Sequence, residues 1–183
     1  SVFNWQGNAK MNSTTTILGQ TAADAELLNP GTNSTYIGAG AGSFQPGGQI
    51  NNTGIGFNAL RGSTTSTFAT CTAVGANALR DLNTGTQCTA VGLNCLVGNL
   101  DSSRCSGLGY QAGNNSMGND VTLLGYRCGI GATGINCQDN TYVGSASGGY
   151  ANNASSTGGF NTAVGSSSMG NQGGNVLSSG SYN

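Results

Sequence analysis

The chain repeats a short phrase nine times, in which polar and apolar positions keep a constant order. Each phrase has a Thr or Ser, one variable residue, an aliphatic residue and a Gly, and successive copies lie 16 to 21 residues apart. Internal repetition with a period of about 18 residues indicates a solenoid, in which each repeat forms one coil. The glycines that end the phrases are Gly19, Gly38, Gly56, Gly75, Gly92, Gly109, Gly125, Gly144 and Gly165.

Two columns of the repeat predict which face of each strand is buried. The hydroxyl column, three residues before the glycine, is Thr16, Thr35, Thr53, Thr72, Thr89, Ser106, Thr122, Thr141 and Thr162. The aliphatic column, one residue before it, is Leu18, Ile37, Ile55, Val74, Val91, Leu108, Leu124, Val143 and Val164. Side chains two residues apart on a strand share a face, and we expect this shared face to be the interior. The variable column between them, which includes Gly54, Tyr36 and Tyr142, is then expected to face solvent or a partner subunit.

The glycine column predicts a corner after every strand. A corner requires a positive φ or a close approach of two backbones, and glycine allows both because it has no Cβ. The column three residues after the glycine never holds a large residue, which indicates a tight position. It comprises Ala22, Ala41, Ala59, Ala78, Cys95, Ala112, Cys128, Ser147 and Ser168.

The fold class that follows is an all-β parallel β-solenoid, or β-roll, of about nine short coils. A coil of this length has room for two or three strands of about 4 to 5 residues with their corners, and leucine-rich and ankyrin arrays are excluded. With strands about 4.8 Å apart, nine coils make a rod about 40 Å long. Stacked coils satisfy their backbones by hydrogen bonds to the coils on either side, without a large apolar core.

Three segments of the chain are expected to differ in role. Residues 1–12 are predicted to be a cap or connector, 13–169 the solenoid, and 170–183 a C-terminal segment that leads into a further repeat or cap. Residues 22–29 precede Pro30 and are compatible with one helical turn. The segments 39–52 and 145–161 are rich in Gly, Ser and Asn and are expected to form loops.

Composition excludes several classes of partner. The chain has 5 Lys and Arg, 6 Asp and Glu, no His and a formal net charge of −1. This charge balance argues against nucleic acid and against an anionic membrane surface as partners. No run approaches 18 apolar residues, so we expect no direct membrane insertion.

Three of the six cysteines share one column. Cys71, Cys88 and Cys105 each stand four residues before a glycine, in three successive coils. We expect their Cα atoms to lie about 4.8 Å apart with parallel Cβ vectors, so one disulfide is possible but the three cannot all pair.

The remaining cysteines give no clearer site. Cys95 and Cys128 are separated by the coil that carries Ala112, and Cys137 falls in a connecting loop. Without His or a Cys-x-x-Cys pair, zinc is not expected. We predict buried free thiols that act as small hydrophobic residues, and no metal or cofactor.

The phrases themselves resemble a known family. Asn52-Thr-Gly-Ile-Gly56, Cys71-Thr-Ala-Val-Gly75, Cys88-Thr-Ala-Val-Gly92 and Asn161-Thr-Ala-Val-Gly165 are similar to the head repeats of trimeric autotransporter adhesins, the YadA-like left-handed β-roll. Related repeats occur in fibre proteins of phages, large viruses and predatory bacteria. The resemblance covers about residues 13–169. It implies a β-roll in each chain, three chains packed about one axis as a homotrimer, and a role in surface attachment.

Catalysis is not expected, and no catalytic residue is assigned. Without His, an enzyme would depend on a few carboxylates and cations at different offsets of the repeat. They are Asp24, Glu26, Asp81, Asp101, Asp120, Asp139, Lys10, Arg61, Arg80, Arg104 and Arg127. A carboxylate pair of the glycosidase kind is therefore disfavoured, although β-solenoids do host polysaccharide-cleaving enzymes.

Binding residues stay open. Arg61 and Arg80 both follow their glycines by five residues and are expected on adjacent coils of one edge, either to meet an anionic sugar or as a solvated edge offset by Asp81. Aromatic residues that could stack on sugar rings, or else form subunit contacts, are Trp5, Tyr36, Phe44, Tyr142, Tyr150 and Phe160.

The function that we expect is an adhesive or receptor-binding domain of a trimeric surface or tail fibre. Such a domain would be extracellular, on a cell or virion surface, and would recognise a cell-surface ligand such as a glycan. The first alternative is a structural spacer within a fibre. The second alternative is an ice-binding β-solenoid, which requires an outward hydroxyl column and is disfavoured by the inward facing predicted above.

Overall fold

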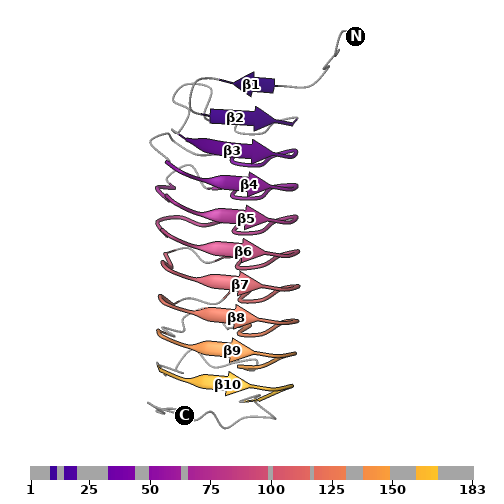
Figure 1. Cartoon of the computed structure of the whole chain (residues 1–183), viewed down its shortest axis with the longest axis vertical. Coiled ribbons are helices and arrows are strands. Elements are labelled where there is room, and N and C mark those ends of the chain that lie inside the picture. The colour runs from indigo at the N-terminus through magenta and orange to yellow at the C-terminus, as the bar shows by residue number, and fades with distance from the viewer. Residues whose placement is uncertain are drawn as a thin grey trace.

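The computed structural model describes residues 9–11, 15–19, 33–43, 50–62, 66–98, 101–115, 118–130, 138–148 and 160–168. In these ranges the regular structure is β-strand without any helix, and all ten strands form one sheet in chain order (Figure 1). The strands are β1 (Ala9–Met11), β2 (Thr15–Leu18), β3 (Ser34–Ile37), β4 (Thr53–Ile55), β5 (Thr72–Val74), β6 (Thr89–Val91), β7 (Ser106–Leu108), β8 (Thr122–Leu124), β9 (Thr141–Val143) and β10 (Thr162–Val164). The predicted all-β parallel solenoid is confirmed.

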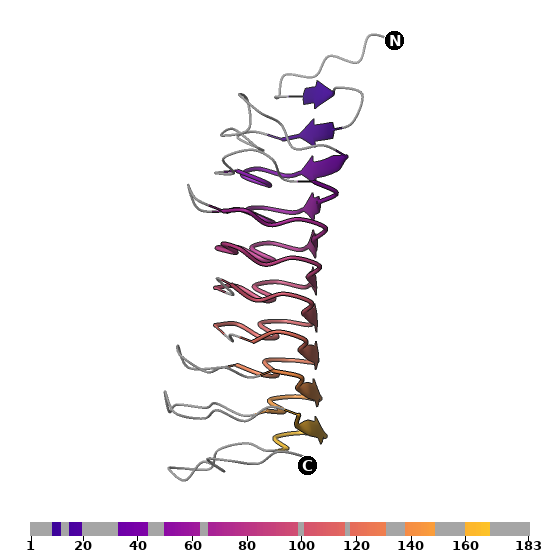
Figure 2. The same ribbon diagram turned by 90° about the vertical axis from the view of Figure 1, so that its left-hand side faces the viewer.

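Strands β2 to β10 form a parallel ladder in which every column of the repeat stays in register. Thr53 pairs with Thr72, Gly54 with Ala73 and Ile55 with Val74, and the same pairing continues along the stack. The strands follow one side of the rod, and the described turns after the corners extend away from them (Figure 2). The ladder therefore aligns equivalent side chains of neighbouring coils.

Each coil contributes one strand in the described ranges, not the two or three that the coil length suggested. The residues after the corner form turns, and these turns still bond from rung to rung. Asn77 N donates to Phe57 O at 2.7 Å and Asn94 N to Ala76 O at 2.9 Å. Positive φ values at Asn58 (52°) and Leu60 (52°) interrupt the extended conformation that a second strand requires.

The glycine column forms the predicted corners. All nine glycines have φ between 127° and 143°, a range that favours glycine. A Cβ added to Gly56 would lie 2.6 Å from the carbonyl oxygen of Gly75 in the next coil. The corners of successive coils are therefore in backbone contact, and this contact excludes every other residue type. The small column beyond the corner is buried at Ala41, Ala59, Ala78, Cys95, Ala112, Cys128 and Ser147.

The facing predicted for the strands is wrong. The variable column is the buried one, with Tyr36, Ala73 and Ala90 at 0% exposure and Tyr142 at 8%. The hydroxyl and aliphatic columns turn outward and are half-buried or exposed in every coil. Alternation along a strand shows only which residues share a face, and the narrow interior of this roll accepts the column that contains Gly and Ala.

Large and small residues complement each other across the interior. A residue four positions after the glycine faces the variable column of the same coil, and where one is large the other is small. Tyr36 meets Gly42, where a Cβ would lie 2.5 Å from the Tyr36 ring, and Leu123 meets Gly129 in the same way. Three coils invert the order and place Leu60, Leu79 and Leu96 beside Gly54, Ala73 and Ala90. In these coils a large residue on one side of the interior is matched by a small one on the other. The coil with Gly107 and Gly113 is the exception, and there Leu96 of the preceding coil lies against Gly107.

The N-terminal end of the ladder is covered by a strand of opposite direction. β1 pairs antiparallel with β2, with Ala9 beside Leu18 and Met11 beside Thr16. The helical turn predicted at 22–29, most of the cap at 1–12 and the segment 170–183 lie outside the described residues. The loop predictions for 39–52 and 145–161 fall partly inside them, where 39–42 and 145–148 are turns.

Candidate functional site

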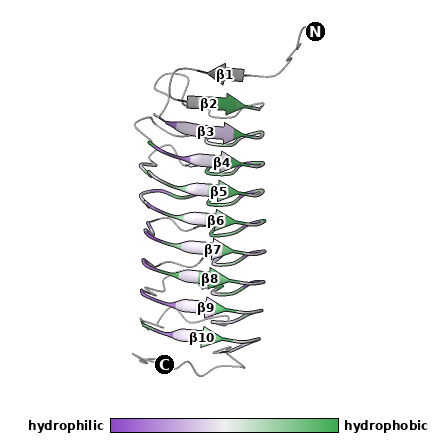
Figure 3. Ribbon diagram, in the orientation of Figure 1, coloured by the Kyte–Doolittle hydropathy of each residue, from purple (hydrophilic) through white to green (hydrophobic). Residues whose placement is uncertain are grey.

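The outward face of the ladder is a uniform surface of the rod. It combines the hydroxyl column with the aliphatic column, and in Figure 3 the strands run from pale or purple at their starts to green at their ends. Five members of the aliphatic column are between 37% and 69% exposed, and the other four are half-buried. Each coil thus presents one hydroxyl and one branched apolar group at the spacing of the β-ladder, about 4.8 Å.

A third column, the residue directly after the glycine, extends the apolar part of this face around the corner. We call it the corner column, and its exposed large members are Phe57, Leu93, Tyr110 and Tyr126. The rings of Tyr110 and Tyr126 stack with centroids 5.5 Å apart and an interplanar angle of 9°. The guanidinium carbon of Arg127 lies 5.9 Å from the centre of the Tyr126 ring. Sequence reasoning missed this column, although four large apolar residues at one offset of the repeat were a signal for it.

No residue of the hydroxyl, aliphatic or corner column between 16 and 166 is charged. An uncharged surface that carries an unbroken column of partly exposed aliphatic side chains is typical of a protein interaction surface. The three columns together are called the ladder face below.

Charged side chains gather instead at the start of the strands. Arg104 Nε donates to Asp120 Oδ1 at 2.5 Å and Arg104 Nη2 donates to Asp120 Oδ2 at 2.7 Å, one coil apart. The hydrogen bond from Arg104 lowers the pKa of Asp120, and the hydrogen bond to Asp120 raises the pKa of Arg104. Arg104 is exposed and Asp120 is half-buried, so this pair links neighbouring coils at the surface and stabilises them weakly.

The predicted neighbours Arg61 and Arg80 do lie on adjacent coils. Asp81 N donates to Arg61 O at 2.9 Å, which aligns the two coils at this edge. Arg80 Nε bonds to Asp81 Oδ2 at 3.0 Å, so Asp81 offsets the charge as the solvated-edge interpretation expected. This edge lies outside the ladder face.

The aromatic candidates divide into two groups. Tyr36 and Tyr142 are buried in the interior, which removes them as ligand contacts and corrects the expectation that they face solvent or a partner. Phe160 is 55% exposed. Trp5, Phe44 and Tyr150 lie outside the described residues.

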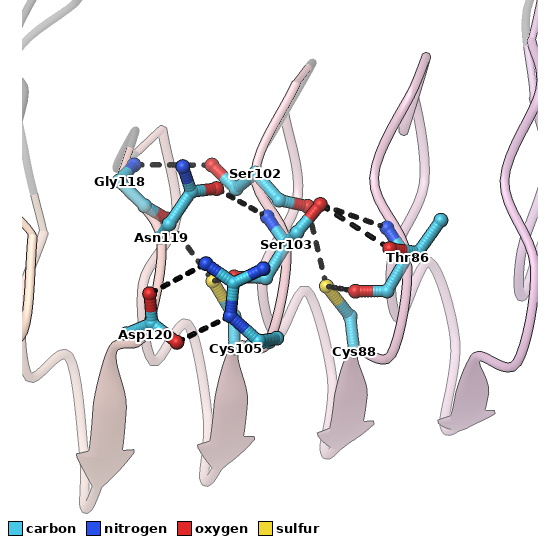
Figure 4. A network of polar contacts seen from close by, with 9 residues as sticks. Thr86, Cys88, Ser102, Ser103, Cys105, Gly118, Asn119 and Asp120 are labelled. Carbon is cyan, nitrogen blue, oxygen red and sulfur yellow. Dashed lines mark hydrogen bonds and ion pairs between the residues drawn. The ribbon is translucent and has the colours of Figure 1, made fainter.

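The predicted cysteine column is present and buried. Cys71, Cys88 and Cys105 are free thiols with exposed fractions of 0%, 1% and 1%, directly before β5, β6 and β7. Each sulfur lies near two backbone carbonyl oxygens; Cys88 Sγ is 3.3 Å from Ser102 O and 3.5 Å from Thr86 O. Figure 4 shows Cys88 and Cys105 one rung apart within a network of polar contacts that extends to Asp120. We call these three residues the thiol column.

Contacts between the thiols shift their pKa values in opposite directions. Side-chain hydrogen bonds from Cys105 and Cys71 lower the pKa of Cys88 in the middle, whereas the contact with Cys88 and burial raise the pKa of both outer thiols. Away from the column, burial raises the pKa of Cys95 to about 12 and that of Cys128 to about 11. Cys95 and Cys128 are separated by the coil of Ala112 as predicted, and Cys137 lies outside the described residues.

The titratable residues do not converge. Among the described residues no three His, Cys, Asp or Glu side chains meet in a group that could hold a metal ion. Asp81, Asp101, Asp120 and Asp139 lie along the surface of different coils, while Asp24 and Glu26 fall outside the described ranges. Within the same ranges no helix has the length and apolar character that a membrane span requires.

No family model, no curated protein and no solved structure matches the chain. The resemblance to YadA-like head repeats therefore rests on the phrases and on the β-roll fold. What the chain does has to be argued from the ladder face.

Proposed function

We propose that this chain is a rod-shaped domain of a homotrimeric surface or tail fibre. The three chains assemble through the ladder face, and the domain attaches the fibre to a cell-surface ligand such as a glycan. The observation that carries the proposal is the uncharged ladder face, on which Ile55, Leu108, Leu124 and Tyr126 are between 38% and 52% exposed. On a single rod these side chains remain in contact with water, and packing against other copies of the chain would bury them.

Several observations support assembly from copies of one chain. The columns stay in register over nine rungs, so two or three rods aligned in parallel would match along their whole length. Identical subunits arranged by rotation about one axis are the commonest form of oligomer. The number three comes from the resemblance to trimeric adhesins. An extracellular position and a fibre that presents several weak sites at once follow from the same resemblance.

Sedimentation equilibrium of the parent chain and of an Ile55→Glu/Leu108→Glu variant tests the assembly. A carboxylate in the centre of an apolar interface is strongly disfavoured, so we expect a trimer for the parent and a monomer for the variant. Thr67→Glu and Gln138→Glu, at exposed positions outside the ladder face, are matched controls that should stay trimeric. A parent chain that is monomeric at all concentrations would contradict the proposal.

Attachment is tested separately from assembly. Residues 148 and 160 are joined by a segment longer than the equivalent segment between 113 and 120, and loops commonly carry binding residues. We would replace residues 149–159 by the shorter connector, residues 114–119, and compare the two trimers on a glycan array. Glycan binding by the parent trimer that disappears when residues 149–159 are replaced supports the adhesive role. A blank array for both supports the spacer alternative.

Ice binding is a second candidate, because the outward hydroxyl column removes the argument that had disfavoured it. Thr53, Thr72 and Thr89 present their side chains to solvent at the spacing of one ladder, beside equally regular aliphatic groups. A regular array of this kind could match a crystal lattice of water. The large rings of the corner column are less suited to a flat lattice. Thermal hysteresis would be measured at micromolar concentration on the parent and on the monomeric variant. Activity supports a ladder face that binds ice, and its absence in both supports a ladder face that binds other copies of the chain.

A further inference from the structure

The thiol column has a geometry that neither the adhesive nor the spacer role uses. Cys71, Cys88 and Cys105 sit on three consecutive rungs, and the backbone bonds Thr72 N to Cys88 O and Thr89 N to Cys105 O, both 2.8 Å, keep them aligned. All three side chains are buried in the roll. Equivalent atoms on such rungs are about 4.8 Å apart.

This spacing matches a linear bridge through one metal ion. A metal–thiolate bond is about 2.3 Å long, so two such bonds in line span about 4.6 Å, close to the rung spacing of about 4.8 Å. A direct disulfide would instead require the sulfurs to approach to about 2.05 Å, although their Cβ vectors run in parallel. The column is therefore better suited to a cation between two sulfurs than to a bond between them.

The surroundings select the kind of cation. Thiolate ligands select soft ions, and no His or carboxylate joins the thiols in a group that could complete a tetrahedral site in the described ranges. Arg104, the nearest charged residue in sequence, is exposed and bonded to Asp120 on the outside of the roll. A buried site without a counter-charge favours a complex with no net charge, which a divalent ion with two thiolates provides.

From this geometry we infer that the thiol column binds one soft, two-coordinate cation such as Hg(II), held between Cys88 and either Cys71 or Cys105. On binding, two thiols release their protons to water and two metal–sulfur bonds form, with no change of oxidation state. Because Cys88 takes part in both arrangements, a second ion cannot be held in the same way. The third thiol remains free. Backbone carbonyls near each sulfur, such as Gly118 O at 3.1 Å from Cys105 Sγ, surround the bridge with weak oxygen contacts.

The test is an equilibrium titration of the full chain with Hg(II) against a competing monothiol, without air and in a Cys137→Ser background. We expect one tightly bound ion per chain and, by X-ray absorption, two sulfur neighbours at about 2.3 Å. Cys88→Ser should abolish this site. Cys71→Ser and Cys105→Ser should each keep it, because one flanking thiol suffices. Cys128→Ser, which removes a buried thiol outside the column, is the matched control and should also keep it.

A second variant keeps the test decisive if Cys88→Ser does not fold. The Cys71→Ser/Cys105→Ser double variant retains Cys88 but removes both possible partners, so it should lose the site as well. Retention of the site in either variant would overturn the inference. A parent chain that binds no ion, shows three or more sulfur neighbours, or instead forms a disulfide in the column would overturn it too.

Discussion

Neighbouring positions on the same strand of this rod have opposite requirements. The variable column faces a narrow interior in which each large side chain is matched by a small residue across the roll, as with Tyr36 and Gly42. The hydroxyl and aliphatic columns, one residue away on either side, face outward and keep their chemical type but not their exact size. A strict size constraint therefore marks the interior of this roll, and a constant chemical type marks its surface.

The corner between the two regions tolerates substitution least. Gly38→Val places a Cβ 2.5 Å from the carbonyl oxygen of Gly56 and imposes a φ of 131° on a β-branched residue. We expect the free energy of unfolding to fall by at least about 3 kcal/mol. Chemical denaturation measures the change. Thr67→Val, at an exposed position outside the ladder face, is the control and should be nearly neutral; equal losses for both variants would refute the corner argument.

Truncation of a large side chain should separate the interior from the surface. Leu79 is fully buried, and Leu79→Ala is expected to cost about 2 to 5 kcal/mol because it removes packing and leaves a cavity. Leu124 is 42% exposed, and Leu124→Ala in the Ile55→Glu/Leu108→Glu monomer should change stability by about 0.5 kcal/mol or less. Thermal or urea unfolding gives both values. A reversed order would mean that the aliphatic column is the interior after all.

Exchanging the large and the small residue of one coil tests whether the two positions share one volume in the interior. Ala73→Leu alone should overpack its coil and cost about 1 to 3 kcal/mol. Combined with Leu79→Gly, it recreates the arrangement of Leu123 and Gly129, and the positive φ of 50° at residue 79 suits glycine. We expect a favourable coupling of about 0.5 to 3 kcal/mol in a double-mutant cycle. Additive effects would show that the two columns do not share one volume.

The smallest expected change in stability concerns the ion pair between Arg104 and Asp120. The pKa of Asp120 is lowered in the folded chain, so its contribution to stability is present above the unfolded pKa and is lost as pH falls through the folded pKa. Asp120→Asn should therefore reduce stability slightly at neutral pH and flatten the acid side of the pH profile, with less difference at high salt. Urea denaturation across the acid range measures this. If the free energy of unfolding of the variant falls with decreasing pH as steeply as that of the parent, the Arg104–Asp120 pair does not contribute to stability.

Much of the fold could be predicted from the repeat. The glycine column predicted the corners, and the spacing of 16 to 21 residues between copies predicted the coil length and the parallel stacking. The stacking of Cys71, Cys88 and Cys105 followed from their shared offset. One strand per coil did not follow, because the positive φ of Leu60, unlike that of Asn58, is not evident from its residue type.

The orientation of the strands could have been predicted but required a second comparison. Alternation alone leaves two choices, and hydrophobicity favoured the wrong one because the aliphatic column is the more apolar. The pairing of Gly54, Ala73 and Ala90 with Leu60, Leu79 and Leu96, and of Tyr36, Leu123 and Tyr142 with glycines at the same offset, reveals the interior column. The ladder face was misjudged for the same reason, and its corner column was overlooked because it is apolar in only part of the stack.

The central claim, that copies of the chain cover the ladder face, is tested most directly by labelling that face. A Leu124→Cys chain in the Cys137→Ser background would be treated with a maleimide, first alone and then combined with Ile55→Glu/Leu108→Glu. The native thiols within the described ranges are buried and should stay silent in both. We predict strong protection of residue 124 in the assembled chain and rapid labelling in the monomeric variant. Rapid labelling in both would contradict the claim.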